Sequence, residues 1–274
     1  MRQLAEIKAE LGTPYYESED VLLYQGDCTA LMERLSQPSF DLTMTSPPYN
    51  IGKEYERVLP LADYVAWCGK WMSRIYDLTL PSGSFWLNVG YVSVADRGKA
   101  VPLPYLLWDQ SPFYLLQEVV WNYGAGVASR KSFSPRNEKL LWYVRDPEGY
   151  YFDLDPVRDP DVKYPNQKKN GKLKCNPLGK NPSDVWQIPK VTSGTNRASR
   201  ERTPHPAQFP SALVERVIKS SSPIGGLVLD PFVGSGTTCV VARQHKRVSV
   251  GFDLRSDYLD LAITRLEASE QQLF

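Results

Sequence analysis

The stretch VLDPFVGSGTT, residues 228–238, contains the clearest structural pattern in the chain. Apolar residues lead to Asp230, glycines follow at Gly234 and Gly236, and residues 237–245 resume with helical spacing. Glycine lets the backbone turn sharply and approach a ligand closely, and the free N–H groups at the start of a helix favour an anion. The stretch is not a phosphate-binding P-loop, because it lacks the Gly-Lys-Ser/Thr sequence that such loops require.

The residues around this turn complete a strand–helix–strand unit. We expect Leu227–Leu229 and Val248–Phe252 to be its strands and residues 256–268 to form the closing helix. Asp253 ends the second strand, 23 residues after Asp230, and in doubly wound folds an acid at about that distance binds ribose hydroxyls. The unit predicts a site for a nucleoside with a carboxylate tail, such as S-adenosylmethionine. The alternative is a plain tight turn followed by a helix-capping aspartate.

The first third of the chain alternates strand and helix patterns. We expect strands at Val21–Tyr24, Phe40–Thr45 and Gly83–Val89, and helices at residues 29–35 and 62–79. This order favours an α/β fold with a mostly parallel twisted sheet and helices on both faces.

A second loop, TSPPYN at residues 45–50, follows one of these expected strands. Its two prolines remove backbone donors and keep the chain extended, so carbonyls and the Ser46 hydroxyl dominate the loop beside the ring of Tyr49. Such a surface can accept both hydrogen bonds of a heterocyclic amine and align it for attack on an electrophile. The alternative is an ordinary proline-rich loop in which Tyr49 packs.

The middle of the chain has a different composition. Strand patterns at Gln117–Tyr123 and Glu138–Val144 precede a stretch from about residue 146 that is rich in Pro, Asn, Lys and Asp. Residues 162–202 contain ten basic and two acidic side chains, a net charge of +8, although the whole chain carries only +1. We expect phosphate contacts in this basic segment, with a solvated loop as the alternative.

The overall composition limits the remaining classes of protein. The chain has 274 residues, enough for one large domain with an insert. Its four cysteines are far apart and form no CxxC pair, so neither a zinc site nor a disulfide framework is indicated. No apolar run is long enough for a transmembrane helix, and the N-terminus lacks a signal-peptide core. We therefore expect a soluble cytoplasmic protein that does not bind a membrane.

Together, the two loops resemble those of the S-adenosylmethionine-dependent DNA amino-methyltransferases. TSPPYN, the basic segment and DPFVGSGTT stand in the order of the circularly permuted beta group. The resemblance covers most of the chain and also includes GDC at 26–28, SPRNEKLLWYV at 134–144, SDVWQIP at 183–189 and HPAQFP at 205–210. The family often has His-Glu where Asn137 and Glu138 stand. The resemblance implies a Rossmann-like class I methyltransferase fold.

The resemblance also implies a division of the chain and a substrate. Residues 1–120 would be the catalytic part, residues 121–203 the target-recognition insert, and residues 204–274 the cofactor-binding part of the same domain. The substrate would be duplex DNA. A base inside a duplex cannot present its amine to such a pocket, so the target base must flip out. A cognate restriction endonuclease and a homodimer are further implied partners.

Site residues follow by position from the family motifs. The implied catalytic residues are Ser46, Pro47, Pro48 and Tyr49. The implied cofactor residues are Asp27, Thr45, His205, Phe209, Asp230, Phe232, Gly234, Ser235, Gly236, Thr237 and Asp253, with Asp253 on the ribose and Asp27 on the adenosine side. The expected nucleic-acid contacts are Arg130, Lys131, Arg136, Lys168, Lys169, Lys172, Asn196, Arg197 and Arg200.

Within the family, the base that is methylated correlates with the first residue of the catalytic Ser/Asp-Pro-Pro-Tyr motif. Ser-Pro-Pro-Tyr usually accompanies cytosine-N4 methylation and Asp-Pro-Pro-Tyr adenine-N6 methylation, so Ser46 favours N4. Cytosine-C5 chemistry needs a Pro-Cys thiolate, and no proline precedes any cysteine here. The open alternatives are adenine-N6 methylation of DNA, methylation of RNA or a protein amide, and a non-catalytic nucleic-acid-binding protein.

Overall fold

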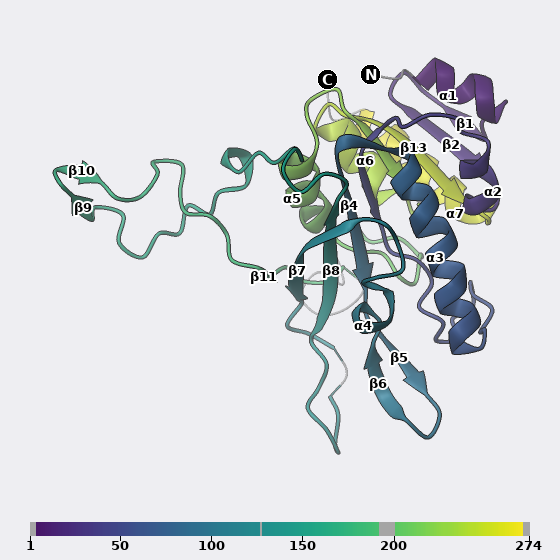
Figure 1. Ribbon diagram of the computed structural model, residues 1–274, viewed down its shortest axis with the longest axis horizontal. Coiled ribbons are helices and arrows are strands. Elements are labelled where there is room, and N and C mark those ends of the chain that lie inside the picture. Colours follow the sequence, from purple (N-terminus) through teal and green to yellow (C-terminus); the bar gives the residue numbers. More distant parts are fainter. Residues whose placement is uncertain (1–3, 127, 192–200, 271–274) are drawn as a thin grey trace.

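The computed structural model of the chain describes residues 4–126, 128–191 and 201–270. Within them, one large sheet of nine strands carries helices on its two faces (Figure 1). The helices are α1 (Leu4–Leu11), α2 (Cys28–Glu33), α3 (Leu61–Leu78), α4 (Pro104–Leu107), α5 (Ser211–Ser221), α6 (Thr237–Gln244) and α7 (Ser256–Glu270), with one 3-10 turn at Asp155–Val157. The sheet strands, in spatial order, are β1 (Tyr16–Glu17), β2 (Val21–Gln25), β13 (Val248–Asp253), β12 (Leu227–Asp230), β3 (Phe40–Thr45), β4 (Thr79–Val89), β8 (Asn137–Val144), β7 (Tyr114–Asn122) and β11 (Val185–Gln187). Two short hairpins stand apart, β5 (Tyr91–Val94) with β6 (Gly98–Pro102) and β9 (Lys168–Lys169) with β10 (Lys172–Leu173).

The centre of the sheet is parallel. β2, β13, β12, β3 and β4 pair in parallel with one another, so their carboxyl ends meet at one edge. β8 is antiparallel to β4 and β7, while β11 returns parallel to β7. The predicted α/β class with a mostly parallel sheet is confirmed, and each predicted strand and helix is present with small shifts of its ends.

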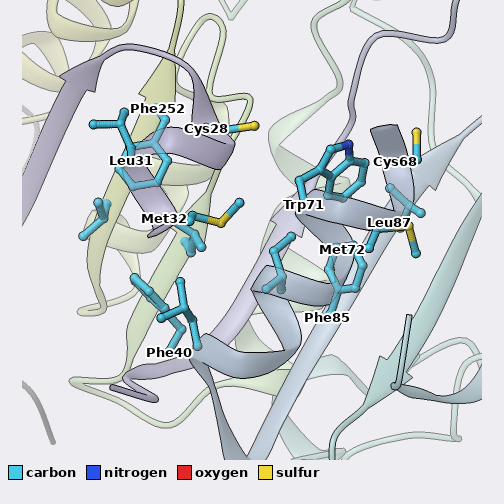
Figure 2. Packing of buried hydrophobic residues seen from close by; sticks show 14 of the residues in the cluster. Cys28, Leu31, Met32, Phe40, Cys68, Trp71, Met72, Phe85, Leu87 and Phe252 are labelled. Carbon is cyan, nitrogen blue, oxygen red and sulfur yellow. The ribbon is translucent and has the colours of Figure 1, made fainter. Parts of the chain in front are cut away.

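The core lies on both faces of the sheet. Because side chains alternate along a strand, Leu22 and Tyr24 of β2 pack on the face covered by α1, α2 and α3, whereas Val21 and Leu23 pack against α6 and α7. Figure 2 shows the first of these clusters, in which Trp71 of α3 is completely buried. A further cluster packs α5 against β3, β4, β7 and β8. Helices on both faces were predicted and are confirmed.

Helix α5 and strand β11 were not predicted from the sequence. Leu213, Val214, Val217 and Ile218 give α5 one buried face, but this helix is short and follows a proline-rich stretch, so its spacing is difficult to recognise. β11 has three residues, fewer than a periodicity argument needs.

An arm leaves the body of the protein between β8 and β11 (Figure 1, left). A bridge between Asp159 and Lys180 closes its base, and we define the arm as residues 159–180; the β9–β10 hairpin lies near its tip. β7 and β8 belong to the large sheet, so the expected boundary between residues 120 and 121 falls inside β7. Between β8 and β11, residues 145–184 lie outside the large sheet.

The cysteines of the chain are all free. Burial raises the pKa of Cys28, Cys68 and Cys239 to about 12, which keeps these three thiols protonated. The described residues contain no group of three or more His, Cys, Asp or Glu side chains placed to hold a metal ion. In the same ranges, no helix combines the length and the apolar character needed to cross a membrane.

Candidate active site

A cavity of about 450 Å³ opens at the edge where the parallel strands end, within the usual size of small-molecule pockets. Its wall includes all four implied catalytic residues and eight of the implied cofactor residues: Ser46, Pro47, Pro48, Tyr49, Asp27, His205, Phe209, Phe232, Gly234, Ser235, Thr237 and Asp253. Thr45, Asp230 and Gly236 are buried and do not line the cavity. The fold thus brings together two loops that are far apart in the sequence.

The glycine loop connects β12 to α6 and has left-handed backbone at both glycines. φ is +48° at Gly234 and +76° at Gly236. A Cβ on Gly236 would lie 2.6 Å from the Cβ and 3.0 Å from the Cα of Ala262, because α7 passes directly behind the loop. Arg265 of α7 donates to the Ser235 carbonyl at 2.7 Å and to Thr237 Oγ1 at 2.8 Å. Helix α7 therefore fixes the shape of the loop from outside the cavity.

Gly236→Ala is expected to destabilise the protein more than an alanine at another left-handed glycine. Gly225 is the matched control, because its φ is +74° and a Cβ there would meet nothing within 4 Å. We expect Gly225→Ala to lower the free energy of unfolding by about 1 kcal/mol and Gly236→Ala by about 3 kcal/mol, since the collision with α7 adds to the backbone strain. Urea unfolding measures both; equal losses would contradict the close approach of α7.

Asp230 anchors the glycine loop to the catalytic loop. Its carboxylate accepts hydrogen bonds from Thr45 Oγ1 at 2.7 Å, Thr238 Oγ1 at 2.6 Å and the Phe232 N–H at 3.1 Å. Burial raises the pKa of Asp230 to about 6, although these three donors oppose the shift. All three donors belong to the chain itself, and Asp230 does not line the cavity.

Asp230→Asn is expected to change how stability depends on pH. The pKa of Asp230 is raised to about 6 from 3.8, so its carboxyl contributes stability below about pH 3.8 that is lost as the pH rises through about 6. When the pH is lowered from neutral to about 5, the free energy of unfolding of wild type should therefore rise by about 1 kcal/mol relative to that of Asp230→Asn. Urea unfolding of both proteins at the two pH values measures the difference. A constant difference would show that Asp230 titrates near its ordinary value.

Asp253 lies where β13 ends, on the cavity wall. Its carboxylate accepts from the Gly234 N–H at 3.0 Å and the Arg255 N–H at 2.9 Å, and burial raises its pKa. Asp27 lies at the end of the neighbouring strand β2 and caps α2 through the Ala30 N–H at 3.0 Å. The cavity thus has two carboxylates at adjacent strand ends, one of which also supports the glycine loop.

His205 closes the cavity opposite the glycine loop. Its Nδ1 accepts from the Ala207 N–H at 3.3 Å, and a Cβ on Gly234 would lie 2.9 Å from its Nε2. Burial, followed by the charges of Arg255 and Arg265, lowers the pKa of His205 to about 4. The imidazole is therefore neutral at physiological pH and carries its proton on Nε2, the nitrogen that faces the glycine loop.

The catalytic loop is held by hydrogen bonds to its backbone and to Asn50. Tyr64 of α3 donates to the Pro48 carbonyl at 2.8 Å. Asn50, with φ of +61°, donates to the Leu59 carbonyl and accepts from the Leu59 N–H. Glu56 accepts from the Asn50 N–H at 2.7 Å. These bonds fix the loop without using the Ser46 hydroxyl, which remains on the cavity wall.

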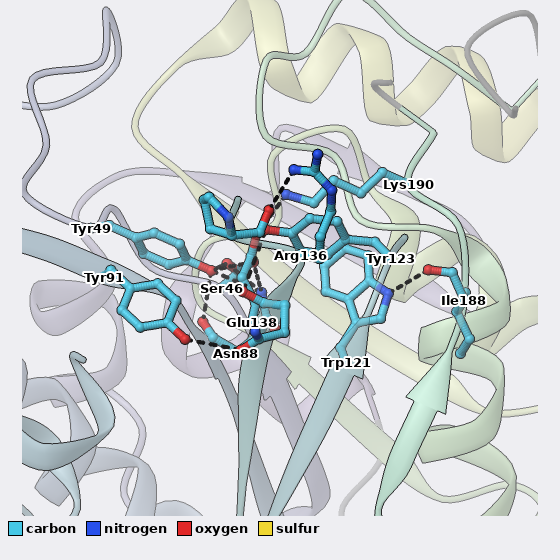
Figure 3. A network of polar contacts seen from close by, with 12 residues as sticks. Ser46, Tyr49, Asn88, Tyr91, Trp121, Tyr123, Arg136, Glu138, Ile188 and Lys190 are labelled. Atoms are coloured by element: carbon cyan, nitrogen blue, oxygen red, sulfur yellow. Dashed lines mark hydrogen bonds and ion pairs between the residues drawn. The ribbon is translucent and has the colours of Figure 1, made fainter. Parts of the chain in front are cut away.

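A network of polar side chains surrounds the Ser46 hydroxyl (Figure 3). Ser46 Oγ lies 3.0 Å from Tyr49 OH, and Asn88 Nδ2 donates to Tyr49 OH at 2.8 Å. Glu138 Oε2 accepts from Tyr49 OH and from Asn88 Nδ2, both at 3.0 Å, while Lys190 Nζ donates to Glu138 Oε1 at 2.7 Å. Burial raises the pKa of Tyr49 well above its ordinary value, so its phenol stays protonated.

Three members of this network were not predicted. Asn88 lies near the end of the apolar stretch GSFWLNV, and Glu138 stands at the start of EKLLWYV; a polar residue beside a buried strand was the available signal. Lys190 is one of many lysines in the basic segment, so no local pattern distinguishes it. Asn137, which the sequence left without a role, accepts a hydrogen bond from Tyr91 OH at 2.9 Å.

Comparison with known sequences identifies the family. The sequence profile of the N6/N4 methyltransferases, described as DNA methylase, matches residues 40–264, a range that contains both loops. This chain belongs to the N6/N4 DNA methylase family. The resemblance to DNA amino-methyltransferases is therefore confirmed at the level of the family.

Two relatives of this methylase are Type II methyltransferases. It is 70% identical to the Type II methyltransferase M.ScaI of Streptomyces caespitosus. The 272 aligned residues cover 99% of this chain and 90% of the relative. It is 36% identical to the Type II methyltransferase M.BglII of Bacillus subtilis, over 88% of this chain and 67% of the relative.

Solved structures share the fold of this methylase. The PvuII DNA methyltransferase, described as cytosine-N4-specific, superposes with a TM-score of 0.74 over 93% of this chain and 89% of its own, at 22% identity. The complex of M1.HpyAVI with S-adenosylmethionine has a TM-score of 0.60, covers 90% of this chain and 98% of its own, and is 21% identical. The class I methyltransferase fold is confirmed.

The expected nucleic-acid contacts of this methylase lie in two regions. Arg130 and Lys131 are exposed in the loop between β7 and β8, and Arg136 of the same loop donates to the Pro135 carbonyl at 2.9 Å. Lys168, Lys169 and Lys172 are exposed in the arm. Asn196, Arg197 and Arg200 lie outside the described residues.

Proposed function

We propose that this chain is a Type II DNA methyltransferase that transfers the methyl group of S-adenosylmethionine to the N4 amine of cytosine in duplex DNA. The observation that carries the proposal is the single cavity shared by the Ser46–Tyr49 loop and the glycine loop with Asp253. One part offers hydrogen-bond acceptors and a tyrosine ring, and the other offers backbone N–H groups and a carboxylate at a strand end. A donor molecule and a flipped base can therefore occupy adjacent places.

The residues present fit S-adenosylmethionine. Asp253 can accept from the ribose hydroxyls and Asp27 from the adenosine side, while the start of α6 offers its N–H groups to the carboxylate of the methionine part. The ring of Phe232, which meets Trp71 edge to face at 5.3 Å, forms an apolar wall. The cofactor, when bound, supplies an electrophilic methyl group.

The reaction needs alignment, acceptors and removal of one proton. Ser46 Oγ and the Pro47 carbonyl accept the two amine hydrogens and turn the nitrogen lone pair toward the methyl carbon, and Tyr49 stacks on the base. The bound cofactor would supply the methyl group to this nitrogen, and its sulfur would keep the electron pair of the broken S–C bond. The amine then loses one proton to return to neutrality.

Cytosine N4 is favoured over adenine N6 by the serine at position 46, following the correlation within the family. Adenine N6 is the second candidate, because the matched family contains methyltransferases for both amines. RNA or protein-amide methylation and a non-catalytic binding role rank below these two candidates, since both loops are intact.

The identity of the product tests the proposal. The protein is incubated with labelled S-adenosylmethionine and mixed-sequence duplex DNA, and the digested nucleosides are identified by mass and retention. N4-methyl-2′-deoxycytidine is expected. N6-methyl-2′-deoxyadenosine would overturn the choice of base and keep the reaction class, whereas no methylated nucleoside would overturn DNA methylation itself.

We further propose that the segment 121–203 contains the residues that recognise DNA. The lysines of the arm would contact phosphates, as would Arg130 and Lys131 of the loop between β7 and β8, whereas Arg136 of the same loop directly follows Pro135, which forms part of the cavity wall. We propose that Asn196, Arg197 and Arg200 reach base edges, because arginine can form two hydrogen bonds with guanine and asparagine two with adenine. A cognate endonuclease, a homodimer and a cytoplasmic location belong to the same proposal, as they accompany Type II modification.

Replacing Lys168, Lys169 and Lys172 with alanine is expected to weaken DNA binding and its dependence on salt. Each lost phosphate contact should reduce the slope of log affinity against log salt by about 0.9. A salt titration of DNA binding by fluorescence anisotropy measures the slope. Lys246→Gln, which removes an exposed charge in the turn just before β13 and outside the arm, is the control. An unchanged slope in the triple variant would remove the arm from the DNA interface.

A further inference from the structure

The carboxylate of Glu138 connects the catalytic loop to a lysine from the far side of the cavity. Its Oε2 accepts from Tyr49 OH and Asn88 Nδ2, and its Oε1 accepts from Lys190 Nζ. The side chains of Glu138 and Lys190 are only 15% and 23% exposed. The Lys190 ammonium also lies 3.8 Å from the centre of the Tyr123 ring, a cation–π contact that holds it over the network.

The contacts determine which way the hydroxyl protons point. The Tyr49 hydroxyl has one proton, and its oxygen lies 3.0 Å from the Glu138 carboxylate but 3.3 Å from the backbone carbonyl of Asn88. A carboxylate is the stronger acceptor, so the Tyr49 proton belongs to Glu138. In the contact of 3.0 Å between Ser46 and Tyr49, Ser46 must then be the donor. The Ser46 proton points to Tyr49. Asn88 Nδ2 lies 3.4 Å from Ser46 Oγ, but its two shorter bonds go to Tyr49 OH at 2.8 Å and to Glu138 Oε2 at 3.0 Å, so Ser46 Oγ keeps a lone pair for a ligand in the cavity.

We propose that Glu138 is a positioning residue that acts on the target amine through Tyr49 and Ser46. This inference rests on the proposed function. Before the reaction, the chain of donors Ser46 to Tyr49 to Glu138 presents Ser46 Oγ as an acceptor. After methyl transfer, one amine proton passes to Ser46 Oγ, the Ser46 proton passes to Tyr49, and the Tyr49 proton passes to Glu138 Oε2, which later releases it to water.

The chemistry of the amine makes a paired carboxylate a sufficient base. A heterocyclic amine that has given its lone pair to a methyl group holds its extra proton weakly, because its neutral form regains conjugation with the ring. Lys190 pairs with the Glu138 carboxylate before the reaction, and the proton that Glu138 then accepts neutralises this carboxylate. Tyr49 passes the proton without ionising, in agreement with its strongly raised pKa.

The test is a double-mutant cycle in the full-length protein. Single-turnover methyl transfer is measured with saturating S-adenosylmethionine and duplex DNA for wild type, Glu138→Gln, Tyr49→Phe and the double variant. Glutamine keeps the shape of Glu138 but cannot take up the proton, so we expect a rate loss on the order of 100-fold. Tyr49→Phe should lose a similar factor, and the double variant should be no slower than either single variant.

Binding measurements and two further variants separate this relay from a general structural effect. The dissociation constants for cofactor and DNA should stay within about twofold of wild type, since no ligand contact is removed. Glu118→Gln, which removes a carboxylate paired with Lys139 at 3.7 Å on the neighbouring strand outside the cavity, should keep the full rate. Glu138→Asp keeps the charge and should recover part of the loss; should Glu138→Gln not fold, this variant takes its place in the cycle.

The outcomes distinguish the two proposals. A full rate in Glu138→Gln, with wild type active, would overturn the relay and leave the proposed function intact. The relay would also be overturned if Glu138→Gln slowed methyl transfer by the same factor in Tyr49→Phe as in wild type, because Glu138 would then not act through Tyr49. Absence of methyl transfer by wild type on any DNA would overturn the proposed function and the relay together.

Discussion

Replacing Ser46 with alanine is expected to slow single-turnover methyl transfer by on the order of 100- to 1,000-fold, the usual effect of removing one hydrogen bond to the reacting group. Ser46 Oγ is the side-chain acceptor of the catalytic loop on the cavity wall, and its proton is directed to Tyr49 at 3.0 Å. Alanine removes the acceptor and leaves the backbone bonds of the loop in place, including the Tyr64 bond to the Pro48 carbonyl. The loss should therefore appear in the rate and not in cofactor or DNA affinity.

Ser36→Ala is the matched control for Ser46→Ala. Ser36 is an exposed serine whose hydroxyl donates to Glu10 at 2.6 Å, far from the cavity, so its loss should leave the methylation rate unchanged. Full activity of Ser46→Ala with normal DNA binding would remove this loop from the chemistry. A parallel loss of cofactor binding would instead place Ser46 in the cofactor site.

Replacing Asp253 with alanine is expected to weaken binding of S-adenosylmethionine by on the order of 100-fold, because two hydrogen bonds from the ribose to a charged group are lost. The same carboxylate accepts from the Gly234 and Arg255 N–H groups, so the glycine loop also loses an anchor. Isothermal titration with the cofactor alone measures the effect. The DNA sequence that is methylated should not change.

Two variants make the Asp253 result specific. Asp253→Asn keeps one acceptor oxygen, enough for one of the two backbone N–H groups that Asp253 binds, and should bind the cofactor with intermediate affinity. Asp257→Ala removes an exposed acid that pairs with Arg255 and does not line the cavity, and it should bind normally. An altered target sequence in Asp253→Ala would move this residue out of the cofactor site.

The sequence predicted the elements in which local pattern and burial agree. Phe40–Thr45 was predicted with the same bounds as β3, because apolar and polar residues alternate along FDLTMT and a proline pair follows after Ser46. The glycine loop was predicted for the same kind of reason, since Gly234 and Gly236 have left-handed backbone that other residues adopt at a cost.

The roles of side chains that act across the fold could not be predicted from local pattern. Asp230 follows its strand as a cofactor residue would, but Thr45, 185 residues away, and Thr238 occupy its carboxylate. Glu138 and Lys190 meet Tyr49 only because β8 lies beside β4 and the chain after β11 returns over the cavity. Such contacts depend on the order of strands in the sheet, which local periodicity does not encode.

The order of strands at the centre of the sheet also determines when the protein can fold during synthesis. β12 and β13 come from the last fifty residues of the chain, yet they lie between β3 and β2, which are made first. Until residues 227–253 have been synthesised, β2 and β3 have no partner on their facing edges, and the apolar side chains of Val21 and Leu23 have no α6 or α7 to cover them. The central sheet can therefore close only after this segment has left the ribosome, and pairings over such long distances along the chain form slowly. A newly made chain acquires its active site only after α7 has been synthesised.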